Sequence, residues 1–94
     1  MQINNSNPMI TLTEVYDTNH WVGGGGQAKF QMGNNEYMYT CTNPSPTGGS
    51  WQTTIYRLRE TAGVGQVFDG PAIYSVYEKV DFNTAVNAAL GLNG

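Results

Sequence analysis

The chain offers few side chains that could carry out a reaction. Its 94 residues include one His, His20, one Cys, Cys41, and four Lys and Arg residues in total. A thiol nucleophile needs an adjacent base and a group that orients that base, and one His and one Cys cannot supply the roughly four ligands of a structural zinc site. Cys41 alternates with Tyr37 and Tyr39, which indicates a buried, unreactive thiol. We therefore favour a non-enzymatic protein without catalytic residues, metal or cofactor.

A run of four glycines, Gly23–Gly26, comes nearest to a ligand-binding motif. Gly23, Gly25 and Ala28 match the G-x-G-x-x-A pattern of dinucleotide-binding loops. That pattern holds a pyrophosphate only where a helix follows at once, whereas residues 28–32 alternate as a strand does. We interpret the run as a flexible loop, with a lid over a small ligand as the alternative.

Two tryptophans and two arginines are the candidate binding residues. Arg57 and Arg59 alternate with Ile55 and Trp51 on one side of a predicted strand. Their guanidinium groups would lie roughly 7 Å apart and could bind a carboxylate, a phosphate or an acidic patch. The alternative is an exposed strand face on which the Arg stems cover apolar surface. Because Trp and Arg are enriched in interaction hot spots, we predict that the binding residues are Trp21, Trp51, Arg57 and Arg59.

The charge of the chain argues against nucleic acid as a partner. The net charge is −3, and only 12% of the residues are charged, about half of the usual share of roughly 25%. The six tyrosines could stack on bases, but a single-strand platform also needs a positive groove. We therefore predict a protein that does not bind nucleic acid.

The distribution of apolar residues argues against a membrane location. No apolar stretch approaches the roughly 18 residues of a membrane-spanning helix, and the first residues lack the charged start and apolar run of a signal peptide. The single Cys excludes an intrachain disulfide, which suits a reducing compartment. We predict a soluble, cytoplasmic protein with no membrane partner.

The pattern of alternation predicts four strands. Their residues are typical of strands, with Tyr, Thr, Val and Phe alternating between turns rich in Gly, Asn and Pro. The ranges are 9–16, 28–32, 37–42 and 51–59. Gly33-Asn34-Asn35 is typical of a tight turn, so Gln27–Thr42 should form a hairpin. Residues 1–8 are predicted to be a flexible polar tail, and residues 9–94 a single domain.

The C-terminal third is predicted to contain a connection, a further strand and a helix. Residues 60–71 carry three glycines and a proline and are expected to form a long connection. Residues 72–80 fit a strand or a helix, and their β-branched and aromatic residues favour the strand. Asp81 is a good N-cap for a helix that begins at Phe82, and Gly91 is placed to end it.

These elements predict an α+β fold: a curved antiparallel sheet of four or five strands with one short C-terminal helix packed on one face. One helix can cover only part of one face, so the sheet must curl on itself or a partner must cover the rest. We therefore interpret the chain as a small protein-interaction module that uses an aromatic sheet face or edge. Its partner would be another protein or a second copy in a homodimer, and a phage or mobile-element accessory protein would fit this character. The alternative is a small-ligand binder or minor enzyme with the Gly23–Gly26 loop as a lid.

Overall fold

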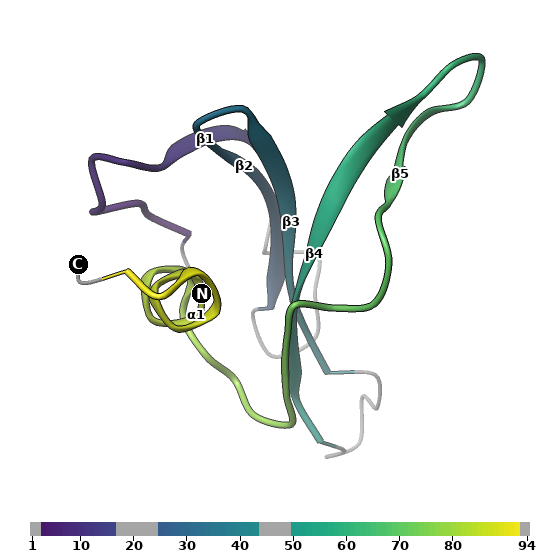
Figure 1. Ribbon diagram of the computed structural model, residues 1–94. Coiled ribbons are helices and arrows are strands. Elements are labelled where there is room, and N and C mark those ends of the chain that lie inside the picture. The colour runs from purple at the N-terminus through teal and green to yellow at the C-terminus, as the bar shows by residue number, and fades with distance from the viewer. Residues whose placement is uncertain (1–2, 17–24, 44–49, 93–94) are drawn as a thin grey trace.

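The computed structural model describes residues 3–16, 25–43 and 50–92 and shows an antiparallel sheet with one helix packed on it (Figure 1). This confirms the predicted α+β class, with six strands in the described residues where four or five were expected. The elements, in chain order, are β1 (Thr11–Val15), β2 (Gly26–Met32), β3 (Asn35–Thr42), β4 (Gln52–Thr61), β5 (Gly65–Phe68), β6 (Tyr74–Val76) and α1 (Phe82–Leu90).

The strands form a meander in which β4 is the most heavily paired. The order is β1-β2-β3-β4-β5, and β6 also pairs with β4. β3 occupies one side of β4, while β5 and β6 share the other side, at Leu58–Thr61 and Thr53–Ile55 respectively. Between them, the Asp69 and Ile73 amides donate to the carbonyls of Arg57 (2.7 Å) and Ile55 (2.8 Å). The outer edge of β4 is thus bonded along most of its length.

The β2–β3 hairpin confirms the most local prediction. Met32 pairs with Asn35, so Gly33 and Asn34 form the two-residue turn. Gly33 has a φ of 61°, as the first central position of a type II′ turn requires.

Two predictions for the C-terminal half needed the structure to decide them. Residues 60–71 were expected to be a connection, but they contain β5, which forms a second hairpin with β4. The prediction was wrong because Gln66-Val67-Phe68 is too short to show alternation and is held by its pairing. The preference for a strand within 72–80 is confirmed by β6.

Helix α1 has the ends that its sequence predicts. The Asp81 carboxylate accepts a hydrogen bond from the Thr84 amide at 3.1 Å, and Gly91 closes the helix with a φ of 66°. Phe82, Ala85 and Val86 face the sheet. No helix in the described parts of the chain has the length and apolarity needed to cross a bilayer.

The core lies between α1 and one face of the sheet. Phe82 packs edge-on against Phe30 and Tyr39, with ring centroids 5.2 and 5.4 Å apart. Tyr39 and Ile55 are fully buried. The Tyr39 hydroxyl donates to the Val80 carbonyl at 2.6 Å, and burial raises the pKa of this tyrosine well above its usual value, so the hydroxyl keeps its proton and remains a donor.

Residues 3–8, expected to form part of a flexible tail, pack against the helix in the structure. Ile3 is only 7% exposed and belongs to the core. The Ser6 amide donates to the Asn83 side chain, which in turn donates to the Asn4 carbonyl at 2.7 Å. The polar composition of this segment is explained by these hydrogen bonds to α1, and its single large apolar side chain, Ile3, is buried.

The face of the sheet opposite α1 carries its own apolar side chains. Figure 1 shows α1 on one side of the sheet and β5 diverging on the other. Alternation along the paired strands places Lys29, Met38, Tyr56, Leu58 and Phe68 on this second face. We call it the open face, since no helix of the described chain covers it.

Candidate functional site

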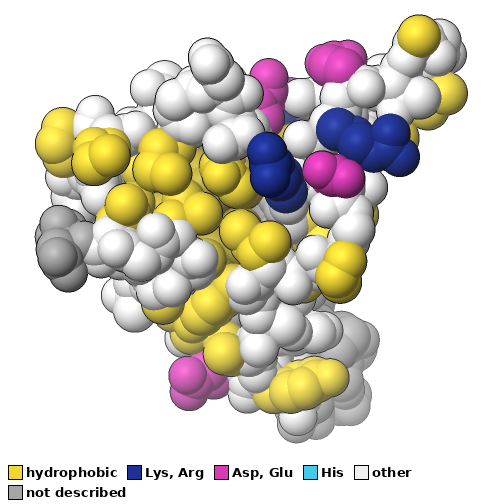
Figure 2. All heavy atoms as spheres, in the orientation of Figure 1, with side chains coloured by type: hydrophobic (Ala, Val, Ile, Leu, Met, Phe, Trp, Pro, Cys, Tyr) yellow, Lys and Arg dark blue, Asp and Glu magenta, His cyan; other side chains and the backbone are white. Residues whose placement is uncertain are grey.

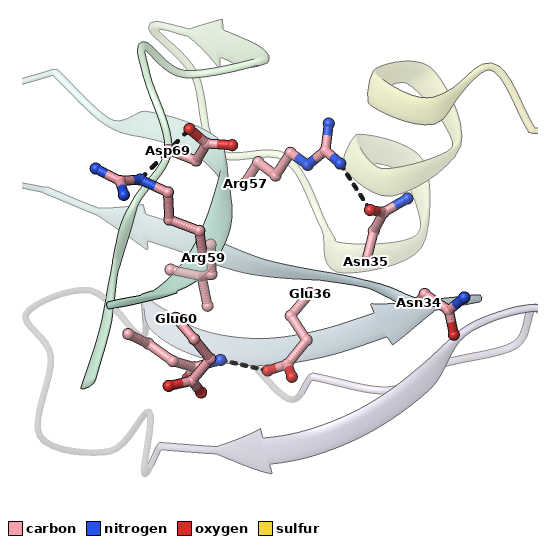
Figure 3. Close-up of a pocket in the computed structure, with 9 residues that line it drawn as sticks. Asn34, Asn35, Glu36, Arg57, Arg59, Glu60 and Asp69 are labelled. Carbon is pink, nitrogen blue, oxygen red and sulfur yellow. Dashed lines mark hydrogen bonds and ion pairs between the residues drawn. The ribbon is translucent and has the colours of Figure 1, made fainter. Parts of the chain in front are cut away.

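Arg57 and Arg59, two of the four predicted binding residues, line one small cavity. This cavity, of about 190 Å³, lies beside the β2–β3 turn, where β4 extends past that turn to pair with β5. We call it the notch. Its lining residues are Asn34, Asn35, Glu36, Arg57, Leu58, Arg59, Glu60, Gln66 and Asp69 (Figure 3).

The two walls of the notch carry opposite charges. Strand alternation places Arg57 and Arg59 on the helix side and Glu36 and Glu60 on the open side. Figure 3 shows Arg57 extending toward Asn35, away from Glu36 and Glu60. Figure 2 shows Lys and Arg side chains beside Asp and Glu side chains in this region. A ligand of one sign would therefore meet attraction on one wall and repulsion on the other.

The charges of the notch are only partly neutralised by other residues that the structure describes. The Arg57 guanidinium donates to the Asn35 side-chain oxygen at 2.7 Å, and Arg59 lies 3.6 Å from an Asp69 oxygen with both side chains about half exposed. Exposed ion pairs of this kind contribute roughly 0–1 kcal/mol. Among the described residues, neither Arg57 nor Glu60 has an oppositely charged partner.

A larger hollow on the open face adjoins the notch. It has a volume of about 480 Å³, and the two cavities share Leu58 and Gln66 in their walls. Its lining is mostly apolar and comprises Tyr16, Lys29, Met38, Leu58, Gln66, Val67 and Phe68. The Phe68 ring stacks on Tyr56 at 4.3 Å, yet Phe68 remains 52% exposed. An aromatic surface on a sheet face is thus accessible beside the notch.

Polar side chains hold the hollow in shape. Lys29 Nζ donates to Gln66 Oε1 at 2.9 Å and lies 3.6 Å from Glu14 Oε2. The Gln66 amide also donates to the Glu36 carboxylate. These contacts join β1, β2 and β3 to β5 across the open face, and two of the residues that make them, Lys29 and Gln66, line the hollow.

Trp51, the third predicted binding residue, lies away from the arginines. Six residues along an extended strand separate it from Arg57, a distance of roughly 20 Å. Its ring lies 4.7 Å from the Lys79 ammonium and packs over Gly25. These contacts give Trp51 a structural role beside β2.

Trp21, the fourth predicted binding residue, lies outside the described residues, as do His20, Gly23 and Gly24. Gly25 and Gly26 are buried, and Gly26 pairs with Cys41 as the first residue of β2. This end of the glycine run is therefore part of the sheet.

Cys41 is buried, as its alternation with the tyrosines predicted. It is fully buried and lies 3.5 Å from the Thr53 hydroxyl. Within the described parts of the chain there is also no group of three His, Cys, Asp or Glu side chains that could hold a metal ion.

The apolar residues of the hollow were not predicted as a site. The strand parity that placed Tyr37 and Tyr39 on one face also placed Met38 on the other, and the same holds for Tyr56 and Leu58 in β4. This second row of apolar side chains was the feature of the sequence that could have indicated a site. The row did not show that the sheet curves and that the curve forms a hollow.

The comparisons with known proteins add no functional assignment. No protein-family model, curated protein or solved structure matches this chain. The function must therefore be argued from the geometry described above.

Proposed function

We propose that this chain is a small protein-interaction module that binds its partner through the open face. The observation that carries the proposal is the exposed Tyr56–Phe68 stack beside a hollow of about 480 Å³. Aromatic side chains supply large contact areas at low entropic cost and are enriched in the centres of protein interfaces. A polar rim surrounds this surface, with Lys29, Glu14 and the charged residues of the notch.

The exposure of Phe68 supports this choice of surface. Phe68 is 52% exposed and its stacking partner Tyr56 is partly buried, whereas the helix-side face buries Phe30, Tyr39 and Ile55 completely. Leu58, only 8% exposed, forms part of the wall. An apolar hollow with one exposed aromatic ring in its lining is an arrangement into which a partner side chain can insert.

The test replaces the exposed aromatic ring and compares what the protein captures. Immobilised wild type, Phe68→Ser and Met9→Ser would be incubated with lysate of the native host, and the retained proteins quantified. Met9 is a matched control because it is 62% exposed but lies outside the sheet. We expect a partner that wild type and Met9→Ser retain and that Phe68→Ser loses. Identical retention by all three proteins would contradict the proposal.

A small-ligand binder is the second candidate, and the hollow is the observation that favours it. Its volume lies within the roughly 300–1,000 Å³ of small-molecule sites, and its lining combines apolar side chains with a few polar ones. A compound from a metabolite set that raises the Tm of wild type and Met9→Ser, but not of Phe68→Ser, would support this function. No shift with any compound would argue against it.

A further inference from the structure

We propose that a second copy of this chain occupies the notch and the adjoining hollow, forming a two-fold symmetric dimer. This inference rests on the proposed function and names the partner. Its basis is that one continuous surface carries an apolar hollow, a wall with arginines and a wall with glutamates.

The charges of the notch complement a second copy of this chain better than a partner that carries only positive or only negative charge. In a two-fold interface the same patch faces itself, so each contact occurs twice. With the axis running between the two walls, Arg57 of each copy faces Glu60 of the other. Each of these residues then gains the oppositely charged partner that it lacks among the described residues. A purely anionic or cationic partner would leave one wall opposed by like charge.

The apolar part of the surface supplies the association energy. The hollow shares Leu58 and Gln66 with the notch, so the dimer would also cover the exposed Phe68 ring. Val64, which is 71% exposed in the β4–β5 turn, would be brought toward the other copy as well. Each partner in a standard interface buries about 800 Å², and the molecule measures 39 × 35 × 22 Å, so one side of it is large enough.

The test is a charge exchange between the two walls. The variants Arg57→Glu and Glu60→Arg would be studied by sedimentation velocity, alone and mixed, from about 1 to about 200 μM, which brackets micromolar affinities. In either homodimer both contacts become repulsive, so we expect the dimer Kd to rise about tenfold or more. In the mixture, the two introduced side chains face each other with opposite charges, and so do the native Arg57 and Glu60 that remain. We expect a heterodimer within about threefold of the wild-type Kd, as paired changes at interacting sites allow.

Two further variants separate a specific interface from general effects. Phe68→Ser should weaken the dimer, whereas Glu78→Arg, an exposed acidic residue outside both cavities, should not. Circular dichroism would verify that all variants fold. Wild type that stays monomeric over the whole range, or a mixture that associates no better than the single variants, would overturn the proposal.

The outcomes distinguish this inference from the proposed function. A monomeric chain that still captures another protein through Phe68 would refute the dimer and leave the interaction module intact. A dimer that is unaffected by changes at residues 57, 60 and 68 would refute the dimer proposed here, because it would form through another surface. The proposed function would fall only if Phe68→Ser also captured the same proteins as wild type.

Discussion

Gly25 lies where the backbone of the chain meets both β3 and a tryptophan ring. A Cβ at this position would overlap the Cys41 carbonyl oxygen and lie 2.9 Å from a carbon of Trp51. The overlap involves backbone, which cannot move aside as a flexible side chain can. The glycine is therefore required by the close approach of the neighbouring strand, a reason that the sequence alone did not reveal.

Replacing this glycine should destabilise the fold without involving the open face. For Gly25→Ala we expect a loss of about 1–3 kcal/mol in the free energy of unfolding, as for other overpacked sites. Gly33→Asn is the control, because a Cβ there meets nothing within 4 Å and Asn tolerates the positive φ. Urea denaturation would measure both. Equal stability of Gly25→Ala and wild type would show that the sheet opens there at little cost.

Thr53 is the buried hydroxyl that fixes the segment between β6 and α1. It accepts from the Val80 amide at 3.1 Å and donates to the Glu78 carbonyl at 2.7 Å. Thr53→Val keeps the side-chain shape but leaves these backbone groups without that partner, so we expect a loss of about 1–3 kcal/mol. Thr54→Val, on the opposite face of the same strand, should cost less. Thermal denaturation of the two variants would compare them, and the reverse order would contradict this role of Thr53.

At the level of elements, the N-terminal segment and α1 stabilise each other. We expect Ile3→Ala to lower the free energy of unfolding by about 2–4 kcal/mol, because Ile3 is 7% exposed within the core. Met9→Ala, directly after this segment and 62% exposed, should change it by less than about 0.5 kcal/mol. Equal, small effects in urea denaturation would mean that residues 3–8 do not contribute to the core in solution.

The N-cap of α1 should add a small contribution to the free energy of unfolding, and this contribution should be lost in acid. Hydrogen bonding from Thr84 lowers the pKa of Asp81 in the folded state. A group whose pKa falls on folding stabilises above its unfolded pKa, near 3.9 for Asp, and that stabilisation is lost as the pH drops through the folded value.

The matching experiment compares Asp81→Ala with wild type between pH 7 and pH 2. We expect the variant to be less stable by about 0.5–2 kcal/mol near neutral pH and the difference in Tm to shrink as the pH falls below about 4. Asp81→Asn should retain most of the neutral-pH stability, since Asn also caps helices well. A difference that is constant across this range would show that the carboxylate charge has no part in the cap.

At the scale of the whole molecule, the burial of Cys41 in the central strands provides a reporter of global unfolding. Cys41 is fully buried, and its strand pairs with β2 and β4 on either side. A thiol reagent should therefore react only after the sheet opens. We expect the free energy of opening from labelling rates to equal the free energy of unfolding from urea. Rapid labelling under native conditions would indicate local opening of β3.

The parts of the fold that could be predicted from sequence are those with local signals. Alternation placed Tyr37, Tyr39 and Cys41 in the core, and the Asp81 and Gly91 caps bounded α1. Strand β5 was missed because it is too short to show alternation and is held in place by its pairing with β4. Ile3 was missed because one apolar residue in a polar segment carries no periodicity.

The candidate site could be predicted only in part, and for the same reason. Arg57 and Arg59 were identified by residue type and spacing, and they line one cavity. The hollow depends on Gln66 reaching Lys29 and Glu36 from another hairpin. Curvature of this kind arises from contacts between strands that are distant in the chain, so no short sequence window contains it.

The way that β5 and β6 divide the outer edge of β4 has a consequence for protein engineering. Residues 69–73 lead from one short strand to the other, and the amides of Asp69 and Ile73 anchor this stretch at its ends. Between the anchors, Gly70 and Pro71 are exposed and belong to neither strand. A foreign peptide or fluorescent label introduced at that junction would therefore be displayed in solvent, and the hydrogen bonds that pair β5 and β6 with β4 would be kept.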